Sequence, residues 1–392
     1  MNAQEWRAVF ALGALYALRM IGMFMVLPVF ALYARELPVP AQPWQAGIAI
    51  GIYGLTQAIV QIPMGIASDR YGRKPVIVIG MLIFAAGSWL AGSTREIEWI
   101  IAGRALQGAG AVSSAVAALL ADVTRDSVRT TAMAILGAGM GLAFVFALVL
   151  GPVVAGWIGV DGIFQLTGVL ALLSLPVVLL GVPTPLRTVE REGDLRAVLT
   201  DPQLVRLDLG IFLLHACMTA VFTTVPLAIV ETLGLPSVEH WKLYLPVLVL
   251  SLVPVFPLIR MAERAGHFKP TFLGAITLLV VALGIAAAGH GVAAALVAAL
   301  LLYFVGFNFL EGALPSLISR IAPPAQKGAA LGVYSSAQFL GAFAGGALGG
   351  FALQHGGIGG AFAATVALPI IWLVVAARLA PPAHHAGDGI RV

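Results

Sequence analysis

Four titratable side chains stand deep inside long apolar stretches, and these residues could do chemistry: Arg19, Arg104, His215 and Glu311. Asn308 precedes Glu311 by one helical turn and shares its helix face. Charged groups inside a membrane are costly and usually functional. A carboxylate or imidazole placed there can gain or lose a proton as its access to water changes. The pattern indicates proton exchange, with Glu311 as the first candidate and His215 as the second.

Each candidate has a structural alternative. Glu311 could pair with an arginine or bond a helix end, and a single histidine in an apolar helix is often only hydrogen-bonded filler. Asp208 lies about one turn inside its apolar segment, so we expect its side chain to reach the aqueous surface.

The elements that position these residues are membrane helices. The chain has 392 residues, of which 10% are charged and 60% hydrophobic, and its mean hydropathy is +0.99. Soluble proteins carry about 25% charged residues, so the composition excludes a soluble enzyme. The apolar segments run without strand-like alternation, which excludes a membrane barrel. The sequence predicts an all-α membrane protein.

Reading between polar and Gly/Pro breaks gives twelve transmembrane helices in two six-helix bundles. The predicted spans are 7–32, 44–68, 75–93, 98–121, 129–157, 161–183, 204–232, 241–262, 270–289, 293–319, 327–354 and 358–379. The predicted domains are an N-terminal bundle (1–183), a cytoplasmic linker (184–203), a C-terminal bundle (204–380) and a cytoplasmic tail (381–392).

Two observations support this organisation. The loop motif Asp69-Arg70-x-Gly72 is echoed by Glu263-Arg264-x-Gly266, which indicates parallel repeats. If the N-terminus is cytoplasmic, 17 of the 22 Lys and Arg residues fall on the cytoplasmic side. We therefore expect a multi-pass membrane protein with both termini in the cytoplasm. The net charge of +4 reflects this topology and predicts no nucleic-acid partner.

A compact polar loop separates the second and third spans. Gly65 permits close helix approach and Gly72 a tight turn, while Asp69 and the cations after it can form ion pairs. Asp122, at the end of the fourth span, is a candidate partner, and such a network can latch one conformation. The alternative is a plain positive-inside charge bias, which leaves the glycine and aspartate spacing unexplained. The predicted latch comprises Gly65, Asp69, Arg70, Gly72, Arg73, Lys74 and Asp122.

This loop resembles G-x-x-x-D-R-x-G-R-K, the signature of the major facilitator superfamily. Residues 104–110, R-A-L-Q-G-A-G, are similar to a second motif of that family, R-x-x-Q-G-x-G. Residues 147–156 resemble the antiporter motif G-x-x-x-G-P-x-x-G-G, with Ala147 and Ala155 in place of two glycines. The likeness covers essentially the whole chain and points to the drug:proton antiporter branch with twelve helices.

Residues 18–28 and 307–316 further resemble the bacterial YajR-like group, which implies a location in the bacterial inner membrane. In that group a soluble domain follows the twelfth helix, and we expect none in this chain. The resemblance implies that Arg104 takes part in proton coupling. Because arginine does not release its proton, that role must be electrostatic. The first span carries no acid, unlike that of some drug:proton antiporters, so an anionic or zwitterionic substrate fits as well as a cation.

The antiporter motif has a physical logic of its own. Gly151 and Gly156 flatten one helix face and Pro152 introduces a kink, so a neighbouring helix can pack closely and pivot there. Close packing without motion is the alternative. Small residues at Gly341, Gly345 and Gly349 repeat the pattern in the second half.

By the family arrangement the first, fourth, seventh and tenth helices line the substrate cavity. The alternative is that most of their polar residues only pack helices together. The predicted lining residues are Arg19, Met23, Gln107, Thr223, Tyr303 and Asn308.

The sequence therefore predicts a secondary active transporter that exports small amphiphilic compounds or drugs in exchange for protons, by alternating access. The alternatives are a proton-coupled nutrient symporter and, from another class, a transport-silent membrane receptor. No nucleophile and base, P-loop or metal-ligand cluster is apparent, so we expect no enzyme, cofactor or metal. The expected partners are a small-molecule substrate, protons and membrane lipids, and we expect a monomer.

Overall fold

The computed structural model describes residues 1–183, 195–264, 267–323 and 326–380, and the regular structure of these residues is entirely helical. The predicted tail and most of the predicted linker lie outside the described residues. The elements are α1 (Ala3–Met25), α2 (Leu27–Tyr33), α3 (Pro43–Tyr71), α4 (Arg73–Gly92), α5 (Ile97–Ala109), α6 (Ser113–Asp122), α7 (Asp126–Gly181), α8 (Leu195–Thr200), α9 (Pro202–Leu233), η1 (Ser237–Glu239), α10 (Trp241–Glu263), α11 (Phe268–Gly289), α12 (Ala293–Ile321) and α13 (Lys327–Ala376).

Two of these helices are too long to cross a membrane once. Helix α7 has 56 residues and α13 has 50, so α7 alone would extend about 84 Å at about 1.5 Å per residue, against about 30 Å of hydrocarbon. Each contains one glycine with positive φ, Gly159 (72°) and Gly357 (61°), at which two helices meet. With these two counted as double crossings, the ten membrane-length stretches of the described chain give the twelve crossings predicted.

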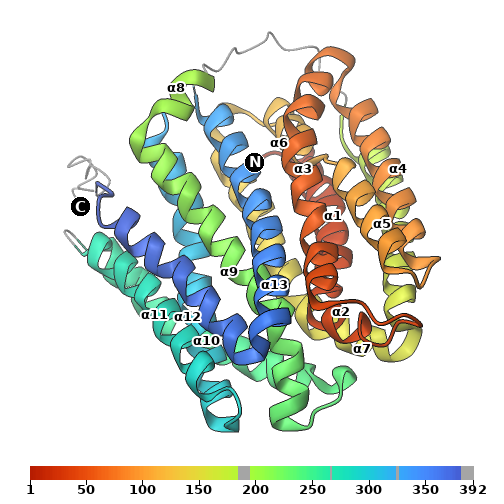
Figure 1. Cartoon of the computed structure of the whole chain (residues 1–392). Helices are drawn as coiled ribbons and strands as arrows, with labels where there is room; N and C mark the ends of the chain where they lie inside the picture. Colours follow the sequence, from red (N-terminus) through yellow and green to blue (C-terminus); the bar gives the residue numbers. More distant parts are fainter. Residues whose placement is uncertain (184–194, 265–266, 324–325, 381–392) are drawn as a thin grey trace.

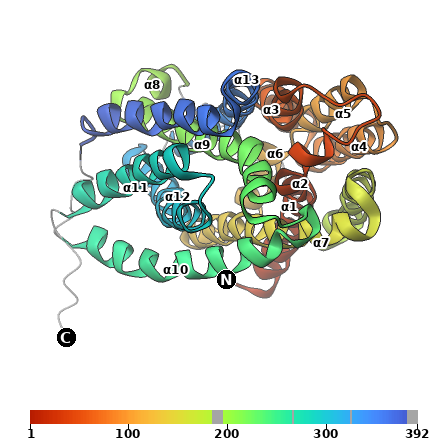
Figure 2. The ribbon, with the colours of Figure 1, turned by 60° about the horizontal axis from the view of Figure 1, so that its bottom comes forward.

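The crossings form two bundles (Figure 1). Helices α1 to α7 group on one side and α9 to α13 on the other, and α13 packs along α3 where the bundles meet (Figure 2). Because the number of crossings is even, both ends of the described chain lie on the same side of the membrane. We call this side the terminal face and the opposite side the far face.

The first and fourth crossings are each divided. The first breaks at Val26 between α1 and α2, ahead of Pro28. The fourth breaks between α5 and α6, at residues 110–112, inside the span that the sequence predicts to be one continuous helix. This second break places a helix N-terminus in the interior of the N-terminal bundle.

Glycines bring α3 and α13 into backbone contact between mid-membrane and the far face. A Cβ added at Gly47 would meet the carbonyl oxygen of Gly346, and one added at Gly54 would meet that of Phe339. The predicted stripe of Gly341, Gly345 and Gly349 instead faces the backbone of α9, inside the C-terminal bundle. Helix α13 therefore uses one small-residue face within its own bundle and another between the bundles.

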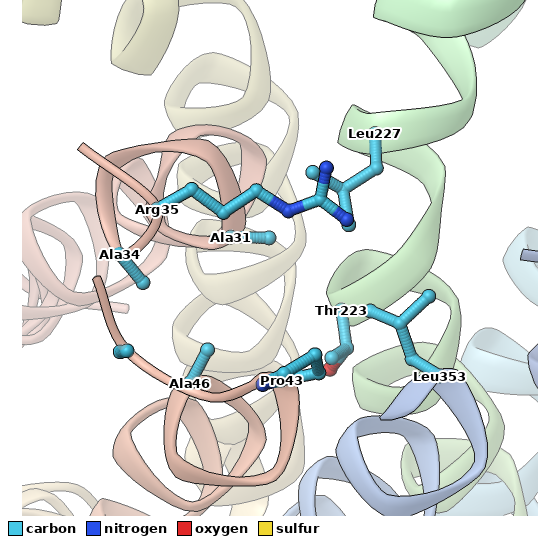
Figure 3. Close-up of a pocket in the computed structure, with 9 residues that line it drawn as sticks. Ala31, Ala34, Arg35, Pro43, Ala46, Thr223, Leu227 and Leu353 are labelled. Atoms are coloured by element: carbon cyan, nitrogen blue, oxygen red, sulfur yellow. The ribbon is translucent and has the colours of Figure 1, made fainter. Parts of the chain in front are cut away.

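Aromatic and polar contacts add to the junction. Phe144 of α7 lies 6.1 Å from Phe222 of α9 and 5.8 Å from Phe307 of α12, measured between ring centroids. At the far face, Arg35 and Glu231 form an ion pair of 3.8 Å between the bundles. A small crevice beside it is lined by Ala31, Ala34, Arg35, Ala41, Pro43, Ala46, Thr223, Leu227 and Leu353 (Figure 3). The bundles therefore contact each other through aromatic rings inside the membrane helices and through an exposed ion pair at the far face.

Candidate functional site

Arg19 lies in the middle of the N-terminal bundle and is fully buried. Its Nη2 donates to the Tyr53 hydroxyl at 2.6 Å and to Gln57 Oε1 at 2.8 Å. Its Nη1 lies 3.4 Å from the hydroxyl of Ser113, the first residue of α6. The guanidinium also stands 5.1 Å from the centroid of the Phe84 ring. All these partners are neutral, and within the described residues no carboxylate contacts the Arg19 guanidinium.

Arg104 is buried in the same bundle but is bonded differently. Its Nε and Nη2 donate to the backbone carbonyls of Ala49 and Ile50 at 3.2 and 3.1 Å, and its Nη1 donates to Gln107 Oε1 at 2.9 Å. Gln107 in turn donates to Ser88 at 2.7 Å. Arg104 and Gln107 thus fasten α5 to α3 and α4, which is a packing role; the predicted parts of Arg104 in proton coupling and of Gln107 in the cavity stay predictions.

The glycines of the second family motif explain the break after α5. A Cβ at Gly108 would meet the Tyr53 carbonyl of α3, and one at Gly110 would meet the Gly80 carbonyl of α4. Only residues without a side chain let α5 end in this tight space, after which α6 begins at Ser113. The motif therefore delivers the N-terminus of α6 next to Arg19.

The C-terminal bundle carries acids in place of buried arginines. Glu311 of α12 is partly exposed, and its Oε2 lies 3.9 Å from His215 Nε2 of α9. His215 Nε2 also lies 2.8 Å from the side-chain amide of Gln338 on α13. Within the described chain, Glu311 Oε2 has no hydrogen-bond partner. The structure thus brings together the two residues predicted as proton acceptors, and Gln338 joins them from a third helix.

Asp208 differs from the sequence-based expectation. Its side chain does not reach the surface: the residue is 8% exposed, and its Oδ1 has no hydrogen-bond partner among the described residues. It lies seven residues before His215 on α9, so the two share a helix face. The seven-residue spacing could have predicted that Asp208 faces the interior together with His215. The position of Asp208 near the helix end does not by itself determine the direction of its side chain.

The remaining predicted cavity residues lie in tightly packed surroundings. Met23, Thr223 and Tyr303 are buried, and the Thr223 hydroxyl donates to the Thr219 carbonyl of its own helix. Asn308 donates to Ser251 of α10 at 3.0 Å. Thr223 also lines the far-face crevice between the bundles, in which Arg35 extends toward Leu227 (Figure 3).

The predicted latch forms an ion-pair cluster within the N-terminal bundle. Arg73 at the start of α4 donates to Asp122 at 3.0 Å, to Ser68 at 2.8 Å and to Asp69. Lys74 donates to the carbonyl of Val182 at 2.6 Å. Gly72 has a φ of 97°, which lets α3 stop and α4 start without an intervening loop. The other members are Gly65, which faces Ser114 of α6, and Arg70, whose guanidinium lies 5.5 Å from the Tyr71 ring centroid.

The predicted hinge, Gly151, Pro152 and Gly156 of α7, lies beside the break between α1 and α2. A Cβ at Gly151 would meet the Met25 carbonyl and the Pro28 ring, where α1 ends and α2 begins. Pro152 lies inside α7, and Gly156 faces Val238 of the C-terminal bundle. The motif thus lies where the first crossing and the opposite bundle both contact α7.

The second copy of the repeat is only partly described. Helix α10 ends at Glu263, and Arg264 follows with an extended backbone. Gly266 lies outside the described residues.

A sequence profile of the Major Facilitator Superfamily matches residues 12–346. The chain belongs to this superfamily. The inner membrane transport protein YajR of Escherichia coli is 42% identical over 390 residues, covering 98% of this chain and 86% of that protein. The multidrug resistance protein MdtH of Aeromonas hydrophila is 28% identical, covering 86% of each chain.

A solved bacterial homologue of the human lysosomal transporter Spinster, in an inward-facing and occupied conformation, has a TM-score of 0.77 to this chain at 15% identity, over 96% of each chain. At that identity the likeness establishes the fold. The superfamily member described here is a multi-pass membrane transporter and not an enzyme, as the sequence predicted.

Proposed function

We propose that this transporter exports small amphiphilic compounds in exchange for protons, and that Glu311 carries the exchanged proton. The observation that supports this most directly is the environment of Glu311: a partly exposed carboxylate, on a membrane helix, with one oxygen that has no hydrogen-bond partner in the described structure. A carboxylate fixed by an arginine would stay ionised through the cycle. Among the described residues, the one cationic group within 4.0 Å of Glu311 is the titratable His215, at 3.9 Å.

Protonation of Glu311 can therefore follow access to water. When the bundles expose it to one side, it can exchange a proton with the water of that side. A substrate with a cationic group stabilises the ionised form, so binding releases the proton. Exchange requires that Glu311 bind either the proton or the substrate, and not both at once.

The two bundles, 1–183 and 204–380, are the moving bodies in this proposal. Their junction at the far face rests on backbone contacts at Gly47 and Gly54 and on the Arg35–Glu231 ion pair, which must separate for the far face to open. The hinge at Gly151, Pro152 and Gly156 would permit the first crossing to pivot on α7. In this cycle the latch cluster around Arg73 sets the relative stability of the two conformations.

Export also fits the relatives. MdtH is named for multidrug resistance, and the antiporter motif at residues 147–156 is retained with two alanine replacements. We place the protein as a monomer in the bacterial inner membrane with the terminal face, and hence both termini, in the cytoplasm. YajR is an inner membrane protein, and the charge distribution supports the orientation.

The test is transport in proteoliposomes with an imposed pH gradient, using a panel of lipophilic cations, anions, zwitterions and neutral dyes. The proposal predicts that the gradient drives substrate against its own gradient, opposite to proton flow. Glu311→Gln should abolish this coupling and leave folding intact, while Glu36→Gln, an exposed loop carboxylate, should leave it unchanged. Substrate movement with proton flow would replace antiport by symport, and full coupling in Glu311→Gln would remove Glu311 from the mechanism.

A further inference from the structure

The arginines of this chain differ in how their charges are balanced. Several, all outside the bundle interior, contact carboxylates in the described structure: Arg35 with Glu231, Arg73 with Asp69 and Asp122, Arg95 with Asp161, and Arg125 with Glu5. Arg19 is fully buried, and the acceptors bonded to it are a phenol, an amide and a serine hydroxyl. A buried charge without a counter-ion is strongly unfavourable.

The N-terminus of α6 adds a second positive feature at the same place. The first N–H groups of a helix have no acceptor within it, and they carry the positive end of the helix dipole. No side chain caps α6 at Val112, and residues 111–113 are buried. Broken membrane helices whose N-termini face an anionic ligand are a recurring device of transporters.

Arg19 retains capacity for a ligand. Its Nε is buried and has no hydrogen-bond partner in the described chain. Its contact with Ser113, at 3.4 Å, and the Tyr16–Ser113 contact, at 3.3 Å, are long and therefore weak. Arg104, in contrast, has all three of its nitrogen positions engaged. Ser113 also accepts from the Gln57 amide at 3.1 Å, and an incoming anion can replace the Arg19 and Tyr16 contacts while that bond remains.

The Arg19 site reaches the junction of the bundles. Tyr53, which accepts from Arg19, packs its ring 6.1 Å from that of Phe339 on α13, centroid to centroid. The residue before Phe339 is Gln338, whose amide lies 2.8 Å from His215, the neighbour of Glu311. A cationic site in one bundle and an anionic site in the other thus stand on opposite sides of one junction.

We infer that the substrate is a zwitterionic amphiphile, whose acidic group binds Arg19 and the N-terminus of α6 and whose amine binds Glu311. This inference rests on the proposed exchange function and names its substrate class. An anion alone would disfavour ionisation of Glu311 and so would not expel its proton. The amine supplies that step, and the carboxylate or sulfonate balances Arg19.

Four compounds of matched size test the inference: naphthylalanine (acid and amine), its primary amide (amine only), naphthylpropanoate (acid only) and naphthylpropanamide (neither). Binding to the purified full-length protein is measured by calorimetry. Naphthylalanine should bind the wild type about tenfold to a hundredfold tighter than its amide, the ratio expected for a charged hydrogen-bonded pair. Failure of naphthylalanine to bind at millimolar concentration, or equal binding of the amide, would overturn the inference.

Variants assign the two groups. Arg19→Gln should remove the preference for the acid and keep the preference for the amine, and Glu311→Gln should do the reverse. Arg19→Lys should keep part of the acid preference, and Ser113→Ala should reduce it; these two variants decide the matter if Arg19→Gln does not fold. An acid preference as large as that of the wild type in every variant that folds would contradict the site.

A pH-indicator dye in the same titrations separates this inference from the exchange function. Proton release by the two amines with no advantage for the acid would leave exchange standing and remove the Arg19 site. An Arg19-dependent acid preference without proton release would leave the anion site standing and remove proton exchange.

Discussion

The two bundles share a fold but treat buried charge in opposite ways. In the N-terminal bundle, Arg19 and Arg104 are surrounded by neutral acceptors drawn from α3, α5 and α6. In the C-terminal bundle, Asp208 and Glu311 each keep an oxygen without a hydrogen-bond partner in the described structure. In the proposed mechanism this difference separates roles: the first bundle supplies fixed positive charge, and the second supplies acids that can change protonation.

Arg104→Ala tests the structural side of this comparison and should have the largest effect on stability. It removes three hydrogen bonds that join α5 to α3 and to Gln107. Groups left unsatisfied cost about 1–3 kcal/mol each, so we expect a loss of about 3 kcal/mol in the free energy of unfolding. Thermal unfolding in detergent measures it. An unchanged transition would show that these bonds are not structural.

Gly151→Ala tests whether the N-terminal bundle is packed as tightly at its predicted hinge as it is around Arg104. The added methyl group would meet the Met25 carbonyl and Pro28, and such overpacking costs about 1–3 kcal/mol. Gly139→Ala is the matched control in the same helix, because open space surrounds Gly139. We expect slower transport and lower stability only for Gly151→Ala. Equal effects at both positions would point to helix propensity.

Asp69→Asn tests the latch. Arg73 keeps Asp122 but loses a charged partner, so the balance between conformations shifts. We expect turnover to fall about fivefold, equivalent to about 1 kcal/mol, with substrate affinity nearly unchanged. Initial rates at several substrate concentrations separate the two. A change confined to affinity would contradict a conformational role.

Asp208→Asn should have the smallest effect on stability, and it should stabilise the protein where Arg104→Ala destabilises it. Replacing a buried carboxylate, one oxygen of which has no hydrogen-bond partner in the described structure, by an amide removes a desolvation penalty. The free energy of unfolding should therefore be unchanged or should rise by up to about 1 kcal/mol. The same unfolding assay measures it beside Arg104→Ala. A clear loss of stability would reveal an ionic partner of Asp208 and weaken the contrast between the bundles.

The helical crossings could be predicted from the sequence, because each is marked by a local signal of about 20 apolar residues between polar breaks. The predicted breaks around residues 158–160 and 355–357 coincide with Gly159 and Gly357. The break between α5 and α6 was not predicted, because its cause is the contact of Gly108 and Gly110 with other helices.

The candidate site was only partly predictable for the same reason. The identities of Arg19, His215 and Glu311 stand out in apolar segments, but a single sequence does not fix the rotation of a helix. The pairing of His215 with Glu311 and the burial of Asp208 both depend on that rotation. The neutral surroundings of Arg19 depend on three other helices.

The most direct test of the central claim is proton release from the purified protein in a pH-indicator dye as amine-bearing amphiphiles are added. The account predicts release from the wild type and none from Glu311→Gln, although Glu311→Gln remains folded. It also predicts that substrate binding weakens in the wild type as pH falls, because protons compete with the amine, and that this dependence disappears in Glu311→Gln. Substrate binding with no proton release, or equal release from Glu311→Gln, would contradict the account.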